Sequence, residues 1–242
     1  MLELITDSAK LGLIVAFVYL ALHLYGQHWR GGWAAVLMRR RVAVLLAIAL
    51  GATGIKIFED VLGRESGPFE AAVMEFVHEQ IPSTFTGFFA AVTATGSFQF
   101  LFPVAALAAL ALVVTKRRFD AVLVALSPAV AAGLVFLIKV AVGRVRPVQG
   151  AELYSDSSFP SGHTVAVAAF ATAVALVSIQ IWPKSRGVVS SMAVAWILLV
   201  ALSRLVLGAH WPTDVLAAAC LGTVIPLLVS LARSAHGSRK KR

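Results

Sequence analysis

The segment AVLVALSPAVAAGLVFLIKVAV, residues 121–142, decides the class of fold. It is 22 residues long and carries a single charge, Lys139, near its C-terminal end. An α-helix needs about 20 predominantly apolar residues to cross the hydrocarbon core of a bilayer, and this run is long enough to do so. The segment therefore predicts a membrane-spanning helix.

Apolar runs flank this segment on both sides. They cover residues 11–26, 42–58, 98–115, 163–182, 188–207 and 214–232. The first run is the shortest, so it either crosses the membrane or lies in the interface. We therefore expect an all-α, polytopic transmembrane helix bundle in which residues 1–242 form a single integral membrane domain. Its predicted parts are an N-terminal helix and cytoplasmic linker (1–41), a six-helix core (42–233) and a basic cytoplasmic tail (234–242).

The composition of the whole chain supports a membrane protein. Hydrophobic residues make up 59% of it and charged residues 14%, with a mean hydropathy of +0.86. Soluble domains carry about 25% charged residues, so soluble, fibrous and disordered classes are excluded. The single cysteine, Cys220, excludes an internal disulfide and a cysteine-based metal site. The N-terminus begins with acidic rather than basic residues, so we expect no cleaved signal peptide.

The distribution of basic residues predicts the topology. The formal net charge is +9, and 14 of the 21 Lys and Arg residues lie in four segments between or after the apolar runs. These segments are 30–41, 116–118, 184–186 and 233–242. The positive-inside rule places them in the cytoplasm and the alternate connections outside, as in a bacterial inner-membrane protein whose C-terminus is cytoplasmic. Because the basic residues lie at membrane boundaries, we expect no nucleic-acid partner.

Two of the outer connections are long. In residues 59–97 the apolar side chains recur at helical spacing, which predicts an amphipathic helix lying in the outer interface. We expect it to pack against the bundle, and the alternative is a lid that guides substrate. The periodic residues are Phe69, Val73, Phe76, Val77 and Ile81. Residues 143–160 are rich in Gly, Pro, Ser and Asp, and they predict a loop.

Four cations depart from the positive-inside pattern: Lys139, Arg144, Arg146 and Arg204. A charge within an apolar span is costly, and snorkelling to the interface could explain one such residue alone. Lys139, Arg146 and Arg204 instead converge on the same side of the membrane. Fixed cations at a membrane surface favour an anion, above all a phosphate. Arg144 could hold a second phosphate, but we expect it to be solvated.

A Pro160-Ser161-Gly162-His163 sequence opens the fifth predicted span. The N-terminus of a helix presents unpaired N–H groups to an anion. Ser161 adds a hydroxyl, Gly162 allows a ligand to approach the backbone, and His163 lies just inside the helix. The alternative is an ordinary helix start.

A histidine and a carboxylate are four residues apart at the start of the last span. His210 and Asp214 can meet across this turn, and Thr213 is a candidate N-cap. A carboxylate that binds one imidazole nitrogen fixes the tautomer and prepares the other nitrogen as a nucleophile or base. An isolated capping pair is the alternative.

These residues resemble the motifs of the type 2 phosphatidic acid phosphatase superfamily, which includes the membrane lipid phosphate phosphatases. The family pattern is Lys-x6-Arg-Pro, then Pro-Ser-Gly-His, then Ser-Arg-x5-His-x3-Asp. The chain matches all three motifs in order, at Lys139–Pro147, Pro160–His163 and Ser203–Asp214. The motifs lie within residues 139–214. The arrangement of spans from residue 42 onward also resembles the six-helix core of the family.

The resemblance implies a role for each of these residues. His210 would attack phosphorus to form a phosphohistidine while Asp214 holds its ring. His163 would act as the general acid and then the general base. The phosphoryl oxygens would be bound by Lys139, Arg146, Ser161, Gly162 and Arg204.

The implied enzyme is a lipid phosphatase that releases phosphate from a lipid mono- or diphosphate at the outer leaflet. Undecaprenyl diphosphate is the first substrate expected, and phosphatidylglycerophosphate, phosphatidic acid and lipid A 1-phosphate are the alternatives. We expect no metal and no cofactor, since the motifs contain no carboxylate cluster with metal-ligand spacing. The partners expected are the phosphorylated lipid and membrane lipids, with no obligate protein partner. A lipid phosphotransferase and a non-catalytic anion transporter remain alternative functions.

The remaining acids of the outer segments carry no predicted role. We expect Glu59, Asp60, Glu152 and Asp156 to be solvated loop residues, and Cys220 to pack between helices.

Overall fold

The computed structural model describes residues 2–28, 32–147 and 155–239, and this part of the chain contains helices and no strand. The predicted all-α helix bundle is confirmed. The helices are α1 (Leu2–His28), α2 (Gly32–Arg39), α3 (Arg41–Gly63), α4 (Gly67–Gln80), α5 (Thr86–Ala94), α6 (Phe98–Val114), α7 (Arg118–Val142), α9 (Gly162–Ile181), α10 (Arg186–Val206) and α11 (Pro212–Arg239). Short 3-10 turns at Ser83–Phe85 and Pro183–Ser185 precede α5 and α10.

Every predicted apolar run falls on a helix. Within the described residues, six helices are individually long and apolar enough to cross a membrane, and a bent pair of helices qualifies as a seventh span. The first of the six is Ala9–His28, so the helix that contains the first run also meets the length and composition requirement. The chain is therefore a polytopic membrane protein.

The second core span contains the helix predicted at residues 98–115, which is α6, and a further helix, α5, precedes it. Helices α5 and α6 meet at a bend of 41°. The end of the predicted outer connection, residues 86–94, is therefore a helix that together with α6 could form one bent span. Ser97 caps α6 by accepting the Phe100 N–H. A β-carbon at Gly96 would lie 3.1 Å from both Val167 and Val200, so the bend presses the backbone against α9 and α10. The close packing of the backbone at Gly96 accounts for the broken helix.

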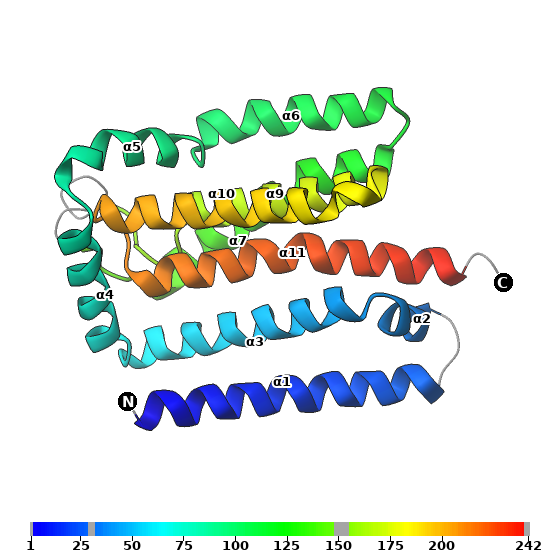
Figure 1. Ribbon diagram of the computed structural model, residues 1–242, viewed down its shortest axis with the longest axis horizontal. Helices are drawn as coiled ribbons and strands as arrows, with labels where there is room; N and C mark the ends of the chain where they lie inside the picture. The colour runs from blue at the N-terminus through cyan, green and yellow to red at the C-terminus, as the bar shows by residue number, and fades with distance from the viewer. Residues whose placement is uncertain (1, 29–31, 148–154, 240–242) are drawn as a thin grey trace.

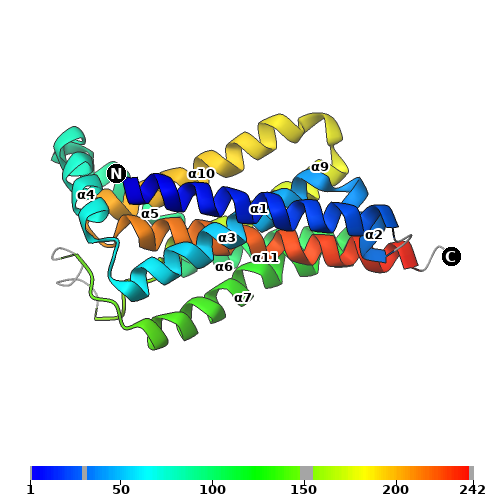
Figure 2. The ribbon, with the colours of Figure 1, turned by 90° about the horizontal axis from the view of Figure 1, so that it is seen from below.

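Helix α9 forms the centre of the bundle and packs against α6, α7, α10 and α11. It is apolar on all sides and built largely from Ala and Val, as expected for a helix surrounded by others. Figures 1 and 2 show the long helices running along one axis. The connections α2–α3, α6–α7 and α9–α10, with the end of α11, lie at one end of the bundle and hold the described residues of the four basic segments.

Helix α4 crosses the opposite end of the bundle, perpendicular to the long helices (Figure 1). The predicted amphipathic helix is thus present, and it packs against α10 and α11. Its packing face is shifted, however: Met74, Val77 and Glu70 are buried, whereas Phe69 and Phe76 are exposed. The same end also carries the described parts of the α7–α9 loop, residues 143–147 and 155–161, and the α10–α11 corner.

Replacing Gly222 by alanine is expected to destabilise the contact between α9 and α11. A β-carbon there would lie 2.5 Å from the Val165 carbonyl oxygen and 2.7 Å from the Ala168 β-carbon. We expect the free energy of unfolding to fall by about 3 kcal/mol, as for an overpacked core, although alanine has a higher helix propensity than glycine. The thermal unfolding midpoint in detergent measures the effect. Gly133→Ala is the matched control, since no atom lies within 4 Å of its β-carbon position, and an unchanged Gly222→Ala midpoint would contradict the packing.

Candidate active site

The three sequence motifs meet at the end of the bundle that α4 crosses. They come from the end of α7 and its following loop, from the start of α9, and from the α10–α11 corner. The Ser161 N–H donates to the Asp214 carbonyl at 3.2 Å, which joins the second motif to the third. Arg146 Nη1 donates to the Ala209 carbonyl at 2.7 Å, which joins the first motif to the third.

His210 and Asp214 form a buried pair, with exposed fractions of 2% and 0%. His210 Nδ1 lies 3.3 Å from Asp214 Oδ2, and this oxygen also accepts the Trp211 N–H at 2.9 Å. Burial lowers the pKa of His210 to about 4, although its hydrogen bond with Asp214 acts in the opposite direction. The imidazole is therefore neutral at neutral pH, as a nucleophile requires.

The second imidazole nitrogen of His210 faces a cation. Its Nε2 lies 3.3 Å from Arg146 Nη1, and a guanidinium can only donate. These two partners imply the tautomer in which Nδ1 carries the proton and donates to Asp214, leaving the lone pair on Nε2. The lone pair consequently points toward the place where Arg146 can hold an anion.

Lys139 and Arg146 share one carboxylate, that of Asp156. Lys139 Nζ binds one carboxylate oxygen at 2.8 Å and Arg146 Nη2 binds the other at 2.6 Å, and both cations also contact the backbone of residues 156–157. Burial raises the pKa of Asp156, but the hydrogen bonds from Lys139 and Arg146 outweigh burial and bring it down to about 2. The pair of cations therefore already binds an oxyanion. Asp156 lies in the loop with its side chain 55% exposed, as expected, but its ion pairs with both cations were not expected.

Arg204 and His163 lie on neighbouring helices beside this cation pair. Arg204 is buried on α10, and its Nη1 donates to Thr93 Oγ1 of α5 at 3.0 Å. His163 is half-buried in the first turn of α9 and lines an apolar cavity together with Lys139 and Gly162. Thr93 is a residue that the motifs did not predict, because only the bend between α5 and α6 brings α5 to Arg204.

Ser161 and Gly162 form the start of α9 as predicted. The fully buried Ser161 caps the helix and accepts hydrogen bonds from the Thr164 N–H at 3.5 Å and the Thr164 hydroxyl at 3.1 Å. No protein atom lies within 4 Å of the place where a β-carbon of Gly162 would stand. The backbone is thus open on the side that a ligand would approach.

Arg144 is held by carboxylates, so the expectation that it is solvated is wrong. Its guanidinium donates to Asp214 Oδ1 and to both carboxylate oxygens of Glu70, at 2.6 Å in each case. Thr213 accepts a further hydrogen bond from Arg144 and donates to Glu70, so it does not serve as the predicted N-cap. Glu70 lies 74 residues before Arg144, and no local pattern indicated that the two would meet.

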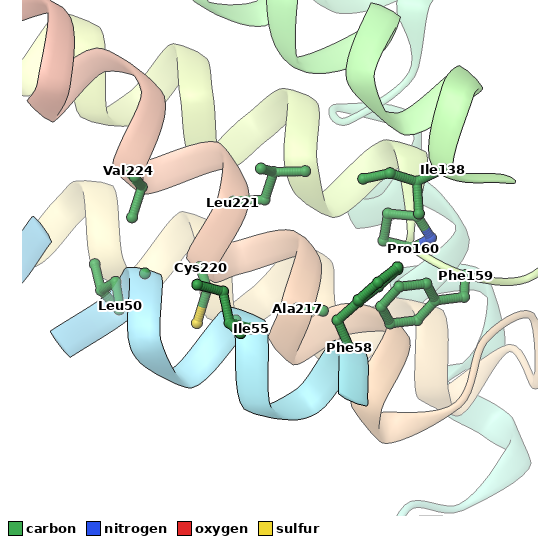
Figure 3. Close-up of a pocket in the computed structure, with 12 residues that line it drawn as sticks. Leu50, Ile55, Phe58, Ile138, Phe159, Pro160, Ala217, Cys220, Leu221 and Val224 are labelled. Atoms are coloured by element: carbon green, nitrogen blue, oxygen red, sulfur yellow. The ribbon is translucent and has the colours of Figure 1, made fainter. Parts of the chain in front are cut away.

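Two apolar cavities lie near the site. The first, about 410 Å³, is formed by α6, α7 and α9, and it reaches Lys139, Gly162 and His163. The second, about 340 Å³, lies between α3 and α11 on the other side of Phe159 and Pro160 (Figure 3). It contains none of the eight predicted site residues. Cys220 lines this second cavity and also packs against Gly54 of α3.

Comparison with known proteins supports the family resemblance. Residues 120–237 match the family model described as the PAP2 superfamily. Phosphatidylglycerophosphatase B of Bacillus subtilis is 30% identical over 142 residues, which cover 57% of this chain and 70% of that protein. Phosphatidylglycerophosphatase B of Escherichia coli is 40% identical over 62 residues, covering 25% of this chain but only 23% of the relative's own length.

A solved structure shares the fold. The crystal structure of a transmembrane PAP2-type phosphatidylglycerolphosphate phosphatase from Bacillus subtilis aligns with a TM-score of 0.68. The alignment covers 81% of this chain and 96% of that one, at 23% sequence identity.

Proposed function

This chain belongs to the PAP2 superfamily, and on that basis we propose that it is an integral membrane phosphatase acting on a phosphorylated lipid. One observation carries the proposal: His210 Nε2 lies 3.3 Å from Arg146, so a neutral imidazole and an anion-binding guanidinium meet at one point. A phosphoryl group bound to Arg146 would lie beside the nitrogen lone pair. Phosphoryl transfer needs such positioning and charge stabilisation above all.

The proposed reaction has two steps. In the first, His210 Nε2 forms a bond to phosphorus while the bond from phosphorus to the lipid oxygen breaks, and His163 donates a proton to that oxygen. In the second, a water oxygen forms a bond to phosphorus while the bond from phosphorus to His210 Nε2 breaks, and His163 accepts a proton from the water. The products are inorganic phosphate and a lipid alcohol, or a lipid monophosphate when the substrate is a diphosphate.

Lys139, Arg146 and Arg204, with Ser161 and the Gly162 N–H, would bind the phosphoryl oxygens during both steps. Preorganised cations of this kind stabilise the charge that spreads over the oxygens in the transition state. We therefore propose metal-independent catalysis without a cofactor. Among the residues that the structure describes, no group of three or more His, Cys, Asp and Glu side chains could hold a metal ion.

The apolar cavity beside His163 suits a lipid chain. It extends along α7 from Ala125 to Lys139, about 20 Å at the rise of an α-helix. A lipid whose phosphate lies at Lys139 could place part of its chain there without leaving the bilayer. The basic segments lie at the other end of the bundle, so we propose that the site faces the exterior or periplasm of a bacterial inner membrane and that the C-terminus is cytoplasmic.

The substrate proposal is phosphatidylglycerophosphate, with undecaprenyl diphosphate second. Both relatives described above are named for the former, whereas the latter was the first substrate expected from the sequence because of the predicted outer location of the site. The test is phosphate release by the purified protein from phosphatidylglycerophosphate, undecaprenyl diphosphate, phosphatidic acid and lipid A, each with excess chelator. We expect release without an added acceptor lipid. Release only with an acceptor would indicate a phosphotransferase, and loss of activity in chelator would contradict the metal-independent reaction.

Replacing Asp156 by asparagine is expected to strengthen binding of phosphate. The Asp156 carboxylate occupies donors of Lys139 and Arg146 that a substrate oxyanion would need. Asp156 is 55% exposed at its side chain, so the competing ion pairs contribute no more than about 1 kcal/mol. We expect the inhibition constant of inorganic phosphate and the KM for lipid phosphate to fall about two- to fivefold. Asp60→Asn, which alters an ion pair with Lys56 away from the site, is the control, and a rise in both constants for Asp156→Asn would refute the competition.

A further inference from the structure

Arg144 lies on the far side of the His210–Asp214 pair from Arg146. It stands in the loop directly after α7, and its side chain is largely buried. Arg146 contacts the imidazole at Nε2, whereas Arg144 contacts the carboxylate at Oδ1. Two arginines, two residues apart in the chain, thus hold the two ends of one histidine–aspartate pair.

The contacts of Asp214 leave its carboxylate little freedom to turn. Oδ2 faces the His210 Nδ1 and the Trp211 N–H, and Oδ1 accepts from Arg144 at 2.6 Å. Rotation of the carboxylate would break a charge-assisted hydrogen bond of a fully buried group, where such bonds are strong. The orientation of Asp214 therefore depends on Arg144.

Glu70 in turn holds Arg144. Its carboxylate is 4% exposed and accepts both hydrogen bonds from Arg144 Nη2, while Thr213 donates to the same carboxylate. Both bonds come from one nitrogen, Nη2, while Nη1 binds Asp214, so the two carboxylates together fix the orientation of the guanidinium. Because Glu70 lies on α4, the helix that crosses the end of the bundle is connected to the histidine through Arg144 and Asp214.

We infer that Arg144 and Glu70 form a positioning pair for the phosphoryl transfer step. This inference rests on the proposed phosphatase function. Arg144 holds Asp214 in the orientation that keeps the Nε2 lone pair of His210 facing phosphorus, and Glu70 holds Arg144 away from the phosphate. Neither residue lines the apolar cavity that reaches Lys139 and His163. Arg144 does line the polar cavity of about 630 Å³ that also contains Lys139 and Arg146, but its guanidinium binds Glu70, Asp214 and Thr213. We therefore expect the pair to act on the rate of transfer more than on the binding of the lipid.

The test is a set of four variants, Arg144→Gln, Arg144→Lys, Glu70→Gln and the double variant Arg144→Gln/Glu70→Gln, assayed for kcat and KM on the lipid phosphate that the wild type hydrolyses best. We expect Arg144→Gln to lower kcat about 10- to 100-fold, as for partners that orient a reactive ligand, with KM changed less than about threefold. Arg144→Lys should recover part of the loss because it retains the charge without the fork. The double variant should be more active than Arg144→Gln, because Glu70 is no longer an uncompensated carboxylate beside Asp214.

A matched control lies at the opposite end of the bundle. Arg117 donates to the buried carboxylate of Asp120 at 2.8 Å, so Arg117→Gln also removes an arginine from a buried carboxylate. We expect it to lower the thermal midpoint and leave kcat unchanged.

Several results would overturn the positioning role. One is an unchanged kcat in Arg144→Gln, and another is a raised KM with normal kcat, which would place Arg144 on the phosphate. A third is a double variant in which the two losses simply multiply. If Arg144→Gln does not fold, an Arg144→Lys or Glu70→Gln protein with wild-type kcat overturns the role in the same way. A wild-type protein that hydrolyses no lipid phosphate would instead refute the proposed function.

Discussion

Replacing His210 by alanine is expected to abolish phosphate release, lowering kcat/KM by at least about 10⁴-fold. His210 brings a neutral nitrogen lone pair to within 3.3 Å of an anion-binding arginine. Without it, water would have to attack the phosphorus directly, and the two-step reaction would be lost. The measurement is phosphate release in excess chelator, compared with the wild type.

The matched control is His78→Ala, an exposed histidine on α4 at the same end of the bundle. It should retain wild-type activity. The covalent step can be examined directly with a ³²P-labelled lipid phosphate and rapid quenching. We expect label on the wild-type protein that is stable to base and labile to acid, as a phosphoramidate is, and none on His210→Ala. A His210→Ala protein that keeps a tenth of the wild-type rate would exclude His210 as the nucleophile.

Replacing Asp214 by asparagine is expected to lower kcat about 10²- to 10⁴-fold, in the range known for carboxylates that orient a catalytic histidine. Both oxygens of Asp214 accept hydrogen bonds, one from Arg144 and the other from the Trp211 N–H and the protonated Nδ1 of His210. An asparagine amide must turn its NH₂ group toward one of these donors. It therefore either loses Arg144 or forces His210 into the tautomer whose Nε2 carries a proton and cannot attack.

The control for this substitution is Asp120→Asn, which changes a buried carboxylate between Arg117 and Arg233 at the other end of the bundle. It is expected to lower the thermal midpoint and preserve kcat. Activity should be measured at equal amounts of folded protein, judged by size exclusion in detergent. An Asp214→Asn protein within threefold of the wild-type kcat would show that the carboxylate does not control the tautomer.

Much of the fold could be predicted because membrane-spanning helices leave a direct record in composition. A span must satisfy its backbone hydrogen bonds internally and expose apolar side chains to lipid, so its length and hydropathy identify it. Composition did not predict the bend between α5 and α6. It depends on the close approach of Gly96 to Val167 and Val200, two residues on helices far along the chain.

The candidate site was predicted unevenly for a related reason. Lys139, Arg146 and Arg204 stood out because each breaks the charge pattern of its surroundings. His210 and Asp214 stood out because residues four apart can meet across the short turn that begins the last span. Arg144 departs from the same pattern, but it lies outside the motifs, and Asp156 is an acid in a polar loop, so both were expected to be solvated. Their partners had to be seen before their roles could be inferred.

The sequence by itself thus determined that the chain crosses the membrane repeatedly, which family motifs it carries, and that three cations of those motifs depart from the positive-inside pattern. These properties follow from local composition and spacing along single helices. Only the tertiary structure decided which polar groups meet: Arg146 with Nε2 of His210, Asp156 with Lys139, and Glu70 with Arg144. Charge pairing acts over a few ångströms in space, and separation along the chain does not encode that distance.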